Sequence, residues 1–426
     1  MLKTIFIQLW NRRRNNLWLL VELLLVFCLV WYMVDYFFVL GYNESLPASR
    51  DTSHTWQVNV RQLPESHPDY KAGESDSTAL EANYARVLDR LRRFDGIEAV
   101  SVITIYSSPN SGNYMGDYYR NKEDTLKEAS GQIVEFDPRE DFFRVFGYRY
   151  PDGKPVSVKD FDWADPKAMV ISKRVSDQLF GSAGGIGKEV VYEDDSHIIK
   201  GVVGDIKRFS YLRTQSTFYL PVKADADNIE DMEIAIRNSD TYADAVFLRK
   251  FKEKMYDELR IGNFYLQSIK SYKQIEKETS ASFGQTGNVR IYSALLLFFL
   301  LNILLCVMGT FWYRIRVRRE EVGLRMAMGA TQQGILRQFF VEGLCLLAII
   351  TIPAMLIEMQ FVYAGMIDTL GQEGKNLVFL PDRMVVRFLL TNSITWLVLA
   401  CMILLAIWIP AKRASRMVPA DALHYE

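Results

Sequence analysis

Four long apolar runs divide the chain, and each is long enough to cross a membrane as a helix. They cover residues 17–40, 289–313, 338–363 and 387–410. A hydrocarbon core needs about 20 residues of helix, so each run predicts a transmembrane span. The pattern therefore predicts a helical membrane protein with one large polar region, residues 41–288, between its first two spans.

The polar region has the pattern of a mixed α/β domain. Two units of the order strand, helix, strand lie near its two ends, and both helices have one apolar face. We expect strands at 55–60, 99–106, 232–237 and 263–269, with helices at 77–94 and 241–259. Between the units, short strand patterns separated by Gly and Asp predict an inserted, mostly-β subdomain over 137–221.

Basic residues near the spans predict the orientation of the chain. They gather before the first span, between the second and third, and after the fourth. Basic residues beside a span are retained in the cytoplasm, so we expect both termini there and residues 41–288 on the outer side, with a short outer loop at 364–386. Residues 1–16 predict an amphipathic helix at the membrane interface, and residues 411–426 a cytoplasmic tail.

The arginine-rich segment 314–337 predicts a cytoplasmic helix with two faces. At about 100° per residue, three arginines beside Glu321 share one arc and three apolar residues share another: Arg314, Arg318 and Arg325, and Ile315, Val322 and Met326. Gly329-Ala330-Thr331 predicts a tight reversal before Gln332 starts the next helix. Anchoring at lipid headgroups explains the arginines but not the acids Glu320 and Glu321 or the apolar stripe. Docking into the groove of a partner protein explains all three. From the spacing alone, both interpretations stay open.

Composition narrows the function. The chain has 426 residues and a net charge of −1, which argues against a nucleic-acid-binding protein whose affinity depends on phosphate neutralisation. Four cysteines lie one in each apolar run, and we expect them to be buried without disulfides: Cys28, Cys306, Cys345 and Cys401. Two acids, Glu22 and Asp35, interrupt the first span. An acid within a span is a functional candidate, although interfacial snorkelling or a hydrogen bond between subunits also explains both.

Three features of the sequence resemble sites for nucleotide or metal binding. Residues 181–189 resemble a phosphate loop, but Glu189 follows Lys188 where a Ser or Thr would be needed to bind magnesium, so we interpret them as a surface turn. The acids at 193–195 are interpreted as a hairpin turn, and the four histidines have no neighbours at metal-ligand spacing. We predict no catalytic residue, metal site, bound cofactor or nucleotide-binding domain.

Several motifs resemble one family. The sequence R-R-E-E-V-G-L-R-M-A-M-G-A-T at 318–331, followed by I-L-R-Q-F-F-V-E at 335–342, closely resembles a signature block of FtsX/MacB-like ABC transporter permeases. The tail at 410–426 resembles the C-terminus of that family. Four further motifs are similar to its periplasmic core domain: F-F-R-V-F-G-Y at 142–148, S-K-R-V-S-D-Q-L-F-G at 172–181, I-G-K at 186–188 and G-V-V-G-D-I-K at 201–207.

The resemblance implies a permease subunit that is not itself an enzyme. It implies a homodimer, or a pair with a paralogue, in the inner membrane of a Gram-negative-type bacterium. A separate cytosolic ABC ATPase would use the ATP, and its motion would pass along the helices to the periplasmic domain. By match to the coupling helix of the family, eight residues would touch or shape the ATPase contact: Arg318, Glu320, Glu321, Val322, Gly323, Arg325, Ala327 and Gly329.

What the subunit moves stays open at this stage. Peptides, lipoproteins and small toxic compounds are all compatible with the resemblance, as is a periplasmic adaptor that would receive them. The alternative is a signal-transmitting subunit, which would regulate a cell-wall hydrolase or a peptide-stress response without transport. Membrane lipids are expected partners in either case, and nucleic acids are not.

Overall fold

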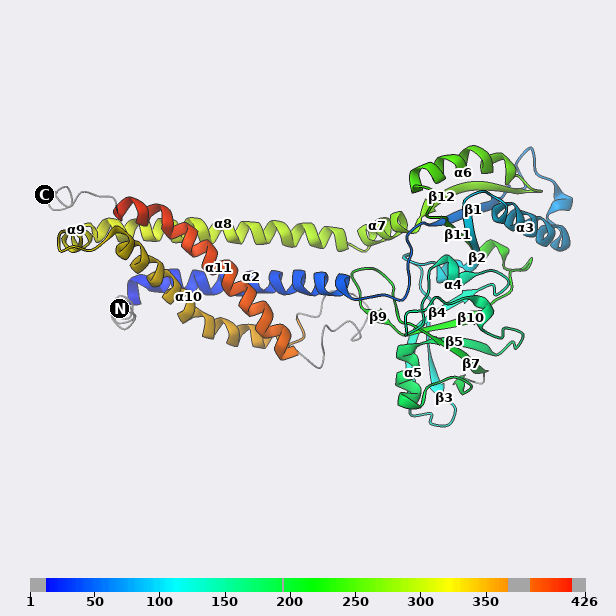
Figure 1. Cartoon of the computed structure of the whole chain (residues 1–426), viewed down its shortest axis with the longest axis horizontal. Coiled ribbons are helices and arrows are strands. Elements are labelled where there is room, and N and C mark those ends of the chain that lie inside the picture. Colours follow the sequence, from blue (N-terminus) through cyan, green and yellow to red (C-terminus); the bar gives the residue numbers. More distant parts are fainter. Residues whose placement is uncertain (1–12, 194, 367–383, 416–426) are drawn as a thin grey trace. The chain divides into compact units, whose positions relative to one another are not determined.

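The computed structural model describes residues 13–193, 195–366 and 384–415. The chain forms two compact units (Figure 1). The helical unit contains the residues up to Glu44 and from Thr286 onward, and the α/β unit is Ser45–Gln285. Most of the predicted interfacial helix at 1–16, outer loop at 364–386 and tail at 411–426 lies outside the described residues.

The helical unit confirms the prediction of four spans. Its long helices are α2 (Arg13–Ser45), α8 (Gln285–Val317), α10 (Gln332–Tyr363) and α11 (Met384–Ser415). Within the described residues, these four helices are long and apolar enough to cross a membrane. A helix satisfies its backbone hydrogen bonds internally, as a hydrocarbon environment requires, and only Pro353 in α10 and Pro410 in α11 interrupt this pattern within the described spans.

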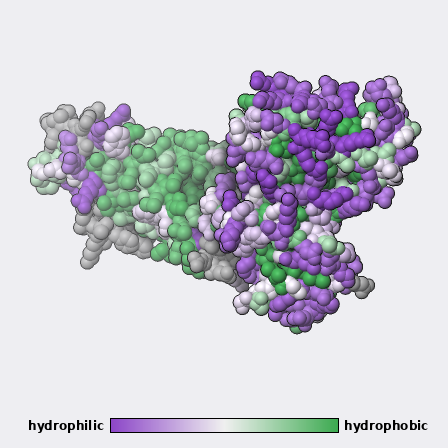
Figure 2. Space-filling view, turned by 45° about the vertical axis from the view of Figure 1, so that its right-hand side comes forward, coloured by the Kyte–Doolittle hydropathy of each residue, from purple (hydrophilic) through white to green (hydrophobic). Residues whose placement is uncertain are grey.

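Side chains from all four helices pack into one buried cluster. Helices α10 and α11 approach closely at Gly343, where a Cβ would lie 2.4 Å from Ile407 and 2.9 Å from Ile403. A larger residue at this position would therefore push the two helices apart. Other large apolar side chains of the unit are exposed, and Figure 2 shows hydrophobic residues gathered over its surface. Such a surface suits contact with lipid.

The α/β unit confirms the two predicted strand-helix-strand units. The first consists of β1 (Thr55–Gln62), α3 (Ser77–Arg92) and β2 (Ile97–Thr104). The second consists of β11 (Met232–Asn238), α6 (Asp244–Glu258) and β12 (Phe264–Ser271). These strands are neighbours in the order β2-β11-β1-β12, and α3 and α6 share one buried cluster with them.

A β-rich part continues the same ten-stranded sheet. Its strands are β3 (Gly116–Asn121), β4 (Glu128–Phe136), β5 (Ala168–Ser172), β6 (Glu189–Tyr192), β7 (Asp195–Val203) and β10 (Thr217–Pro221). Two short helices, α4 (Phe142–Val145) and α5 (Lys173–Phe180), and a two-stranded sheet of β8 (Ile206–Lys207) and β9 (Thr214–Gln215) complete it. The β-rich part therefore begins at Gly116 rather than at 137, because β4 pairs in parallel with the distant β10.

The motif at 142–148 builds the core of this part. Phe142 stacks on Phe136 of β4 with ring centroids 4.7 Å apart, and Phe143 and Tyr148 pack against the same cluster. All four side chains are buried. Gly147, with φ +56°, takes the left-handed conformation that glycine adopts readily. The motif that resembles the family therefore has a structural role here.

Candidate functional site

The arginine-rich segment forms a short helix followed by a tight turn, and the turn lies at the reversal predicted for residues 329–331. Helix α8 ends at Val317, and α9 comprises Arg319–Ala327. Gly329 then adopts φ +95°, which reverses the chain. Thr331 caps α10, its hydroxyl accepting a hydrogen bond from the Gly334 amide at 3.1 Å. The predicted cytoplasmic helix at 314–337 is thus divided among the end of α8, α9 and the start of α10.

Two arginines of this segment are buried against a carboxylate of α10. Arg314 Nη1 lies 3.1 Å from Glu342 Oε1, and Arg318 Nη1 lies 2.9 Å from Glu342 Oε2. The side chains are 13%, 10% and 5% exposed in the order Arg314, Arg318, Glu342. Their guanidinium groups therefore point at α10 rather than away from the chain. They join the end of α8 and the start of α9 to α10.

Polar and apolar contacts fix α9 on α10 as well. Arg325 Nη2 pairs with Glu321 at 2.5 Å, and its Nη1 donates to Gln338 of α10 at 2.7 Å. Val322 belongs to the same buried cluster as Phe339 of α10. One face of helix α9 is consequently packed against α10 of the same chain.

The eight residues predicted to touch or shape a partner fall into two groups. Five face inward or are partly buried: Arg318, Glu321, Val322, Gly323 and Arg325. Three are exposed: Glu320, Ala327 and Gly329. The prediction omitted Leu324 and Met328, which are 52% and 72% exposed. Their spacing of four from Glu320 places these three residues on one helical stripe, a signal already present in the sequence.

A second buried ion pair lies between α2 and α11. Arg387 Nε donates to Asp35 Oδ1 at 2.9 Å and Nη2 donates to the other carboxylate oxygen. Both side chains are almost fully buried. One turn away on α2, Trp31 Nε1 donates to Thr391 of α11 at 3.0 Å. Interfacial snorkelling and a hydrogen bond between subunits are therefore both wrong for Asp35, whose partner belongs to the same chain.

Glu22, the other acid of the first span, and the four cysteines also differ from expectation in their contacts and exposure. Glu22 accepts a hydrogen bond from the Cys306 thiol at 2.7 Å, within the chain. Cys28, Cys306 and Cys345 are only half-buried and Cys401 is exposed, so the prediction of buried cysteines is wrong. All four are free. Small side chains that face lipid need no protein packing, which accounts for their exposure.

Residues 181–189, which resemble a phosphate loop in sequence, form a turn that connects α5 to β6. Residues Gly181–Ala183 form a 3-10 turn that leads toward β6. The Lys188 ammonium lies 4.9 Å from the centroid of the Phe180 ring, a cation–π contact. Within 13–193, 195–366 and 384–415, no group of three or more His, Cys, Asp or Glu side chains is arranged to hold a metal ion.

Helix α7 (Tyr272–Ser282), which precedes α8 in the chain, is held to the sheet by a buried carboxylate. Glu233 of β11 accepts hydrogen bonds from the Tyr272 hydroxyl, from the Ser108 hydroxyl at 2.8 Å and from Gln57 at 2.6 Å. Burial raises the pKa of Glu233, and the three donors counteract that rise. The first turn of α7 is thus fixed on the central strands.

A second network joins α7 to the segment that follows α2. Glu276 of α7 accepts from the Ser210 amide at 2.7 Å and from Asn110 Nδ2 at 3.3 Å. Arg50 donates to Asn110 Oδ1 at 2.9 Å and to the Lys207 carbonyl at 2.8 Å. Asn110 therefore bonds to residues near both points where the chain enters and leaves the α/β unit.

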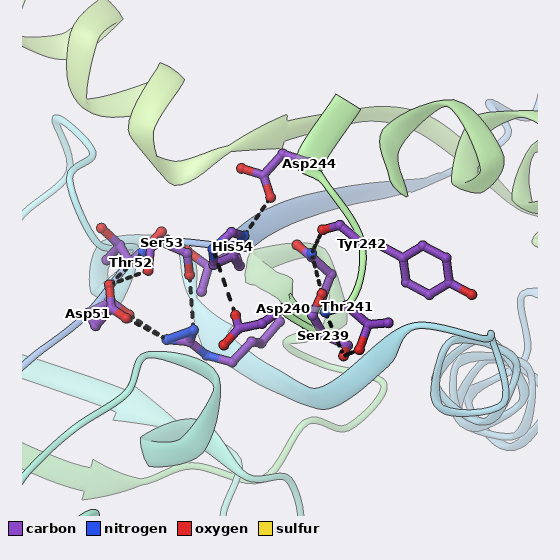
Figure 3. Close-up of polar contacts among 12 residues, drawn as sticks. Asp51, Thr52, Ser53, His54, Ser239, Asp240, Thr241, Tyr242 and Asp244 are labelled. Carbon is purple, nitrogen blue, oxygen red and sulfur yellow. Dashed lines mark hydrogen bonds and ion pairs between the residues drawn. The ribbon is translucent and has the colours of Figure 1, made fainter. Parts of the chain in front are cut away.

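The start of β1 is held by a separate polar cluster (Figure 3). His54 Nδ1 lies 2.7 Å from Asp244 at the start of α6, and its Nε2 lies 3.7 Å from Asp240. Arg237 of β11 donates to the Asp51 carbonyl at 3.0 Å. These contacts bind residues 51–54 firmly to the sheet.

Comparison with known proteins matches both units. The MacB-like periplasmic core domain matches residues 37–249, half of the chain, and the FtsX-like permease C-terminal domain matches residues 293–419. The chain belongs to the MacB/FtsX-like permease family. Helix α9, the Glu342 cluster and the Asp35 partner Arg387 all lie inside the FtsX-like match.

Relatives of this permease carry export names. Macrolide export ATP-binding/permease protein MacB 2 of Aeromonas hydrophila is 25% identical over 316 residues, which cover 72% of this chain and 44% of the relative. MacB of Hahella chejuensis is 24% identical over 296 residues, 67% of this chain and 42% of the relative. The permease thus spans less than half the length of these relatives. The solved periplasmic region of MacB from Actinobacillus actinomycetemcomitans aligns with a TM-score of 0.31 at 14% identity, covering 54% of this chain and 93% of that one.

Proposed function

We propose that this permease is the membrane subunit of an ABC transporter and that a separate cytosolic ATPase drives it through α9. The observation that carries the proposal is the structure of α9 itself, which has one face fixed by buried charges and another exposed. Family membership and the relatives' names, which combine ATP binding with a permease, support the same assignment. ATP is used by the partner, and the permease supplies no catalytic residue.

The exposed stripe of α9 has the composition of a docking surface. Leu324 and Met328 are apolar and more than half exposed, and the exposed Glu320 adds a charge one turn before them. Covering apolar side chains with a partner protein is favourable. It stabilises the complex by about 25 cal/mol for each Å² of apolar surface removed from water. An apolar stripe with a charge beside it suits a groove that accepts one face of a helix.

The buried charges make α9 a rigid part of the bundle. Since Arg314 and Arg318 share the carboxylate of Glu342, displacement of α9 would carry the ends of α8 and α10 with it. Helix α8 has 33 residues, or about 50 Å at 1.5 Å per residue. A continuous helix of this length can transmit a displacement along its axis without a channel for substrate.

The α/β unit is built to receive such a displacement. The chain passes from α7 to α8 through Phe283 and Gly284, and α7 is bonded to the sheet through Glu233 and Glu276. Pulling or pushing on α7 would therefore act on the central strands. The motion would expel or release a substrate taken from the periplasm or the membrane.

The charge pattern and the family support a proposal for the wider setting of the permease. We place the permease in the inner membrane of a Gram-negative-type bacterium, with both termini cytoplasmic and the α/β unit periplasmic. It would work with a second copy or a paralogue, among membrane lipids, and deliver to a periplasmic adaptor. Regulation of a cell-wall hydrolase without transport is the alternative that the same architecture allows.

Photo-crosslinking in cells of the native organism tests the docking of α9. A benzoylphenylalanine at Met328, 72% exposed beside α9, is expected to form an adduct that contains an ABC ATPase. The matched control is the same group at Tyr363, 93% exposed at the opposite end of α10, which is expected to give no ATPase adduct. Absence of the ATPase from the Met328 adducts, or equal crosslinking from both positions, would overturn the proposal.

A further inference from the structure

Glu358 is a fully buried carboxyl group of the helical unit. It lies on α10, and its exposed fraction is 0%. One turn earlier on the same helix, Ala354 is also 0% exposed and belongs to the buried apolar cluster of the unit. The carboxyl group therefore faces the interior of the bundle rather than lipid. Neither the docking of α9 nor the two buried ion pairs described above involves it.

Both carboxyl oxygens of Glu358 are without a hydrogen-bond partner among the described residues. Its charged neighbour is Asp35 of α2, which has the same sign of charge. Arg387 directs Nε and Nη2 to Asp35, so the charge of Asp35 is already balanced. An ionised carboxylate in an apolar interior needs a cation or several donors, because its transfer from water is otherwise very costly. The residues around Glu358 do not meet that need.

The polar side chain beside Glu358 is Asn392 of α11. It is 5% exposed, and its Nδ2 donates to the Phe388 carbonyl at 3.1 Å. Exchanging the oxygen and nitrogen of the amide would place two acceptors against each other at Phe388, so the orientation shown is favoured. Within the described part of the chain, Oδ1 of Asn392 accepts no hydrogen bond. Asn392 thus has a spare acceptor, which an ionised carboxylate cannot use.

A proton on Glu358 resolves both features. A protonated carboxyl group is neutral, and it has one O–H donor. The donor matches the acceptor that Asn392 has to spare, and neutralisation removes the isolated charge from the apolar interior. One proton therefore accounts for a buried acid without a cation and for a buried amide oxygen without a donor.

We propose that Glu358 is a proton-binding site within the bundle, a neutral carboxylic acid that donates a hydrogen bond to Asn392 Oδ1. The bond ties α10 to α11 without placing a charge between them. It acts at a different place from the Glu342 cluster, which joins α10 to α8 and α9. The assignment goes beyond the proposed function and does not need the ATPase, so it is tested on the permease alone.

Infrared difference spectroscopy of the purified full-length permease in detergent tests the protonation of Glu358. The spectrum of Glu358→Gln near neutral pH is subtracted from that of the parent. We expect the difference to contain the C=O stretching band of one protonated carboxylic acid. Glu253→Gln is the matched control, because Glu253 is exposed on α6 and an exposed carboxyl group is ionised near neutral pH. That control is expected to lose carboxylate bands instead, and the same loss in Glu358→Gln would overturn the assignment.

Thermal unfolding of Glu358→Gln gives a second measurement of the same charge. The unfolding temperature is expected to stay close to that of the parent, because the amide is also neutral and keeps a donor for Asn392. A marked rise in the unfolding temperature would show that the parent buries an unpaired charge at this position. That result would contradict the presence of a proton.

Asn392→Leu separates the hydrogen bond from the structural role of the side chain. It removes the acceptor, so the C=O band of the acid is expected to move to higher frequency. Thr395→Val is the matched control on the same helix, since Thr395 is 0% exposed and its hydroxyl donates to the Thr391 carbonyl at 2.9 Å. It is expected to leave the band in place. An unmoved band in Asn392→Leu, or an equal shift in Thr395→Val, would overturn the role of Asn392.

Discussion

Glu342→Gln is expected to destabilise the helical unit and to uncouple it from the ATPase proposed above. The change removes the negative charge that Arg314 and Arg318 share, and the side chains of these two arginines are only 13% and 10% exposed. Breaking a buried ion pair from one side costs about 3–5 kcal/mol. That is a large part of the total stability of about 5–15 kcal/mol that a typical domain has.

The measurements are thermal unfolding of the purified permease in detergent and ATP hydrolysis by the reconstituted complex. Glu321→Gln is the matched control, because Glu321 also pairs with an arginine but both side chains are more than a third exposed. Such a surface pair contributes about 1 kcal/mol or less. Equal unfolding temperatures for the two variants would show that the Glu342 cluster does not hold α8, α9 and α10 together.

Breaking the pair between Asp35 and Arg387 is expected to have a comparable effect on folding. Asp35→Asn removes the negative charge that faces Arg387, whose side chain is 2% exposed, inside the helical bundle. Because both side chains are almost fully buried, breaking the pair from one side is expected to cost about 3–5 kcal/mol. We expect little monodisperse protein on size-exclusion chromatography and a clearly lower unfolding temperature.

The double variant Asp35→Asn/Arg387→Gln isolates the interaction. It removes both charges, so much of the lost stability is expected to return. Glu22→Gln serves as the control within the same span, because Glu22 bonds only a neutral thiol and its loss should cost about 1 kcal/mol. Parental stability in Asp35→Asn, or a double variant worse than the single one, would contradict the account of this pair.

Much of the fold was predictable because it depends on local pattern. The four apolar runs became α2, α8, α10 and α11, since a span is set by its length and composition alone. The helices over Ser77–Arg92 and Asp244–Glu258 follow from the spacing of residues such as Val87 and Phe251, which lie in the core. The start of the β-rich part at Gly116 was not predictable, because it depends on the long-range pairing of β4 with β10.

In the candidate site, too, features set by local sequence were predictable, and features set by long-range contacts were not. The position of α9 after the second span was evident, but the burial of Arg314 and Arg318 depends on Glu342, which lies on another helix. Asp35 and Arg387 both occur near the predicted outer ends of spans, so matching acids and bases by depth could have suggested that pair. The exposed stripe of Leu324 and Met328 is evident from their spacing of four residues, whereas the charges of the segment point to different positions.

The rate of ATP hydrolysis in the reconstituted complex tests the docking of α9 most directly. Leu324→Asp places a charge in the centre of the exposed stripe and leaves the buried face unchanged. Loss of a buried leucine contact, worth about 1.5–3 kcal/mol, predicts that stimulation of the ATPase falls about tenfold or more. Val246→Asp, at an apolar position of α6 that is 38% exposed, is expected to stimulate as the parent does. Parental stimulation by Leu324→Asp would contradict the proposal that the ATPase acts through α9.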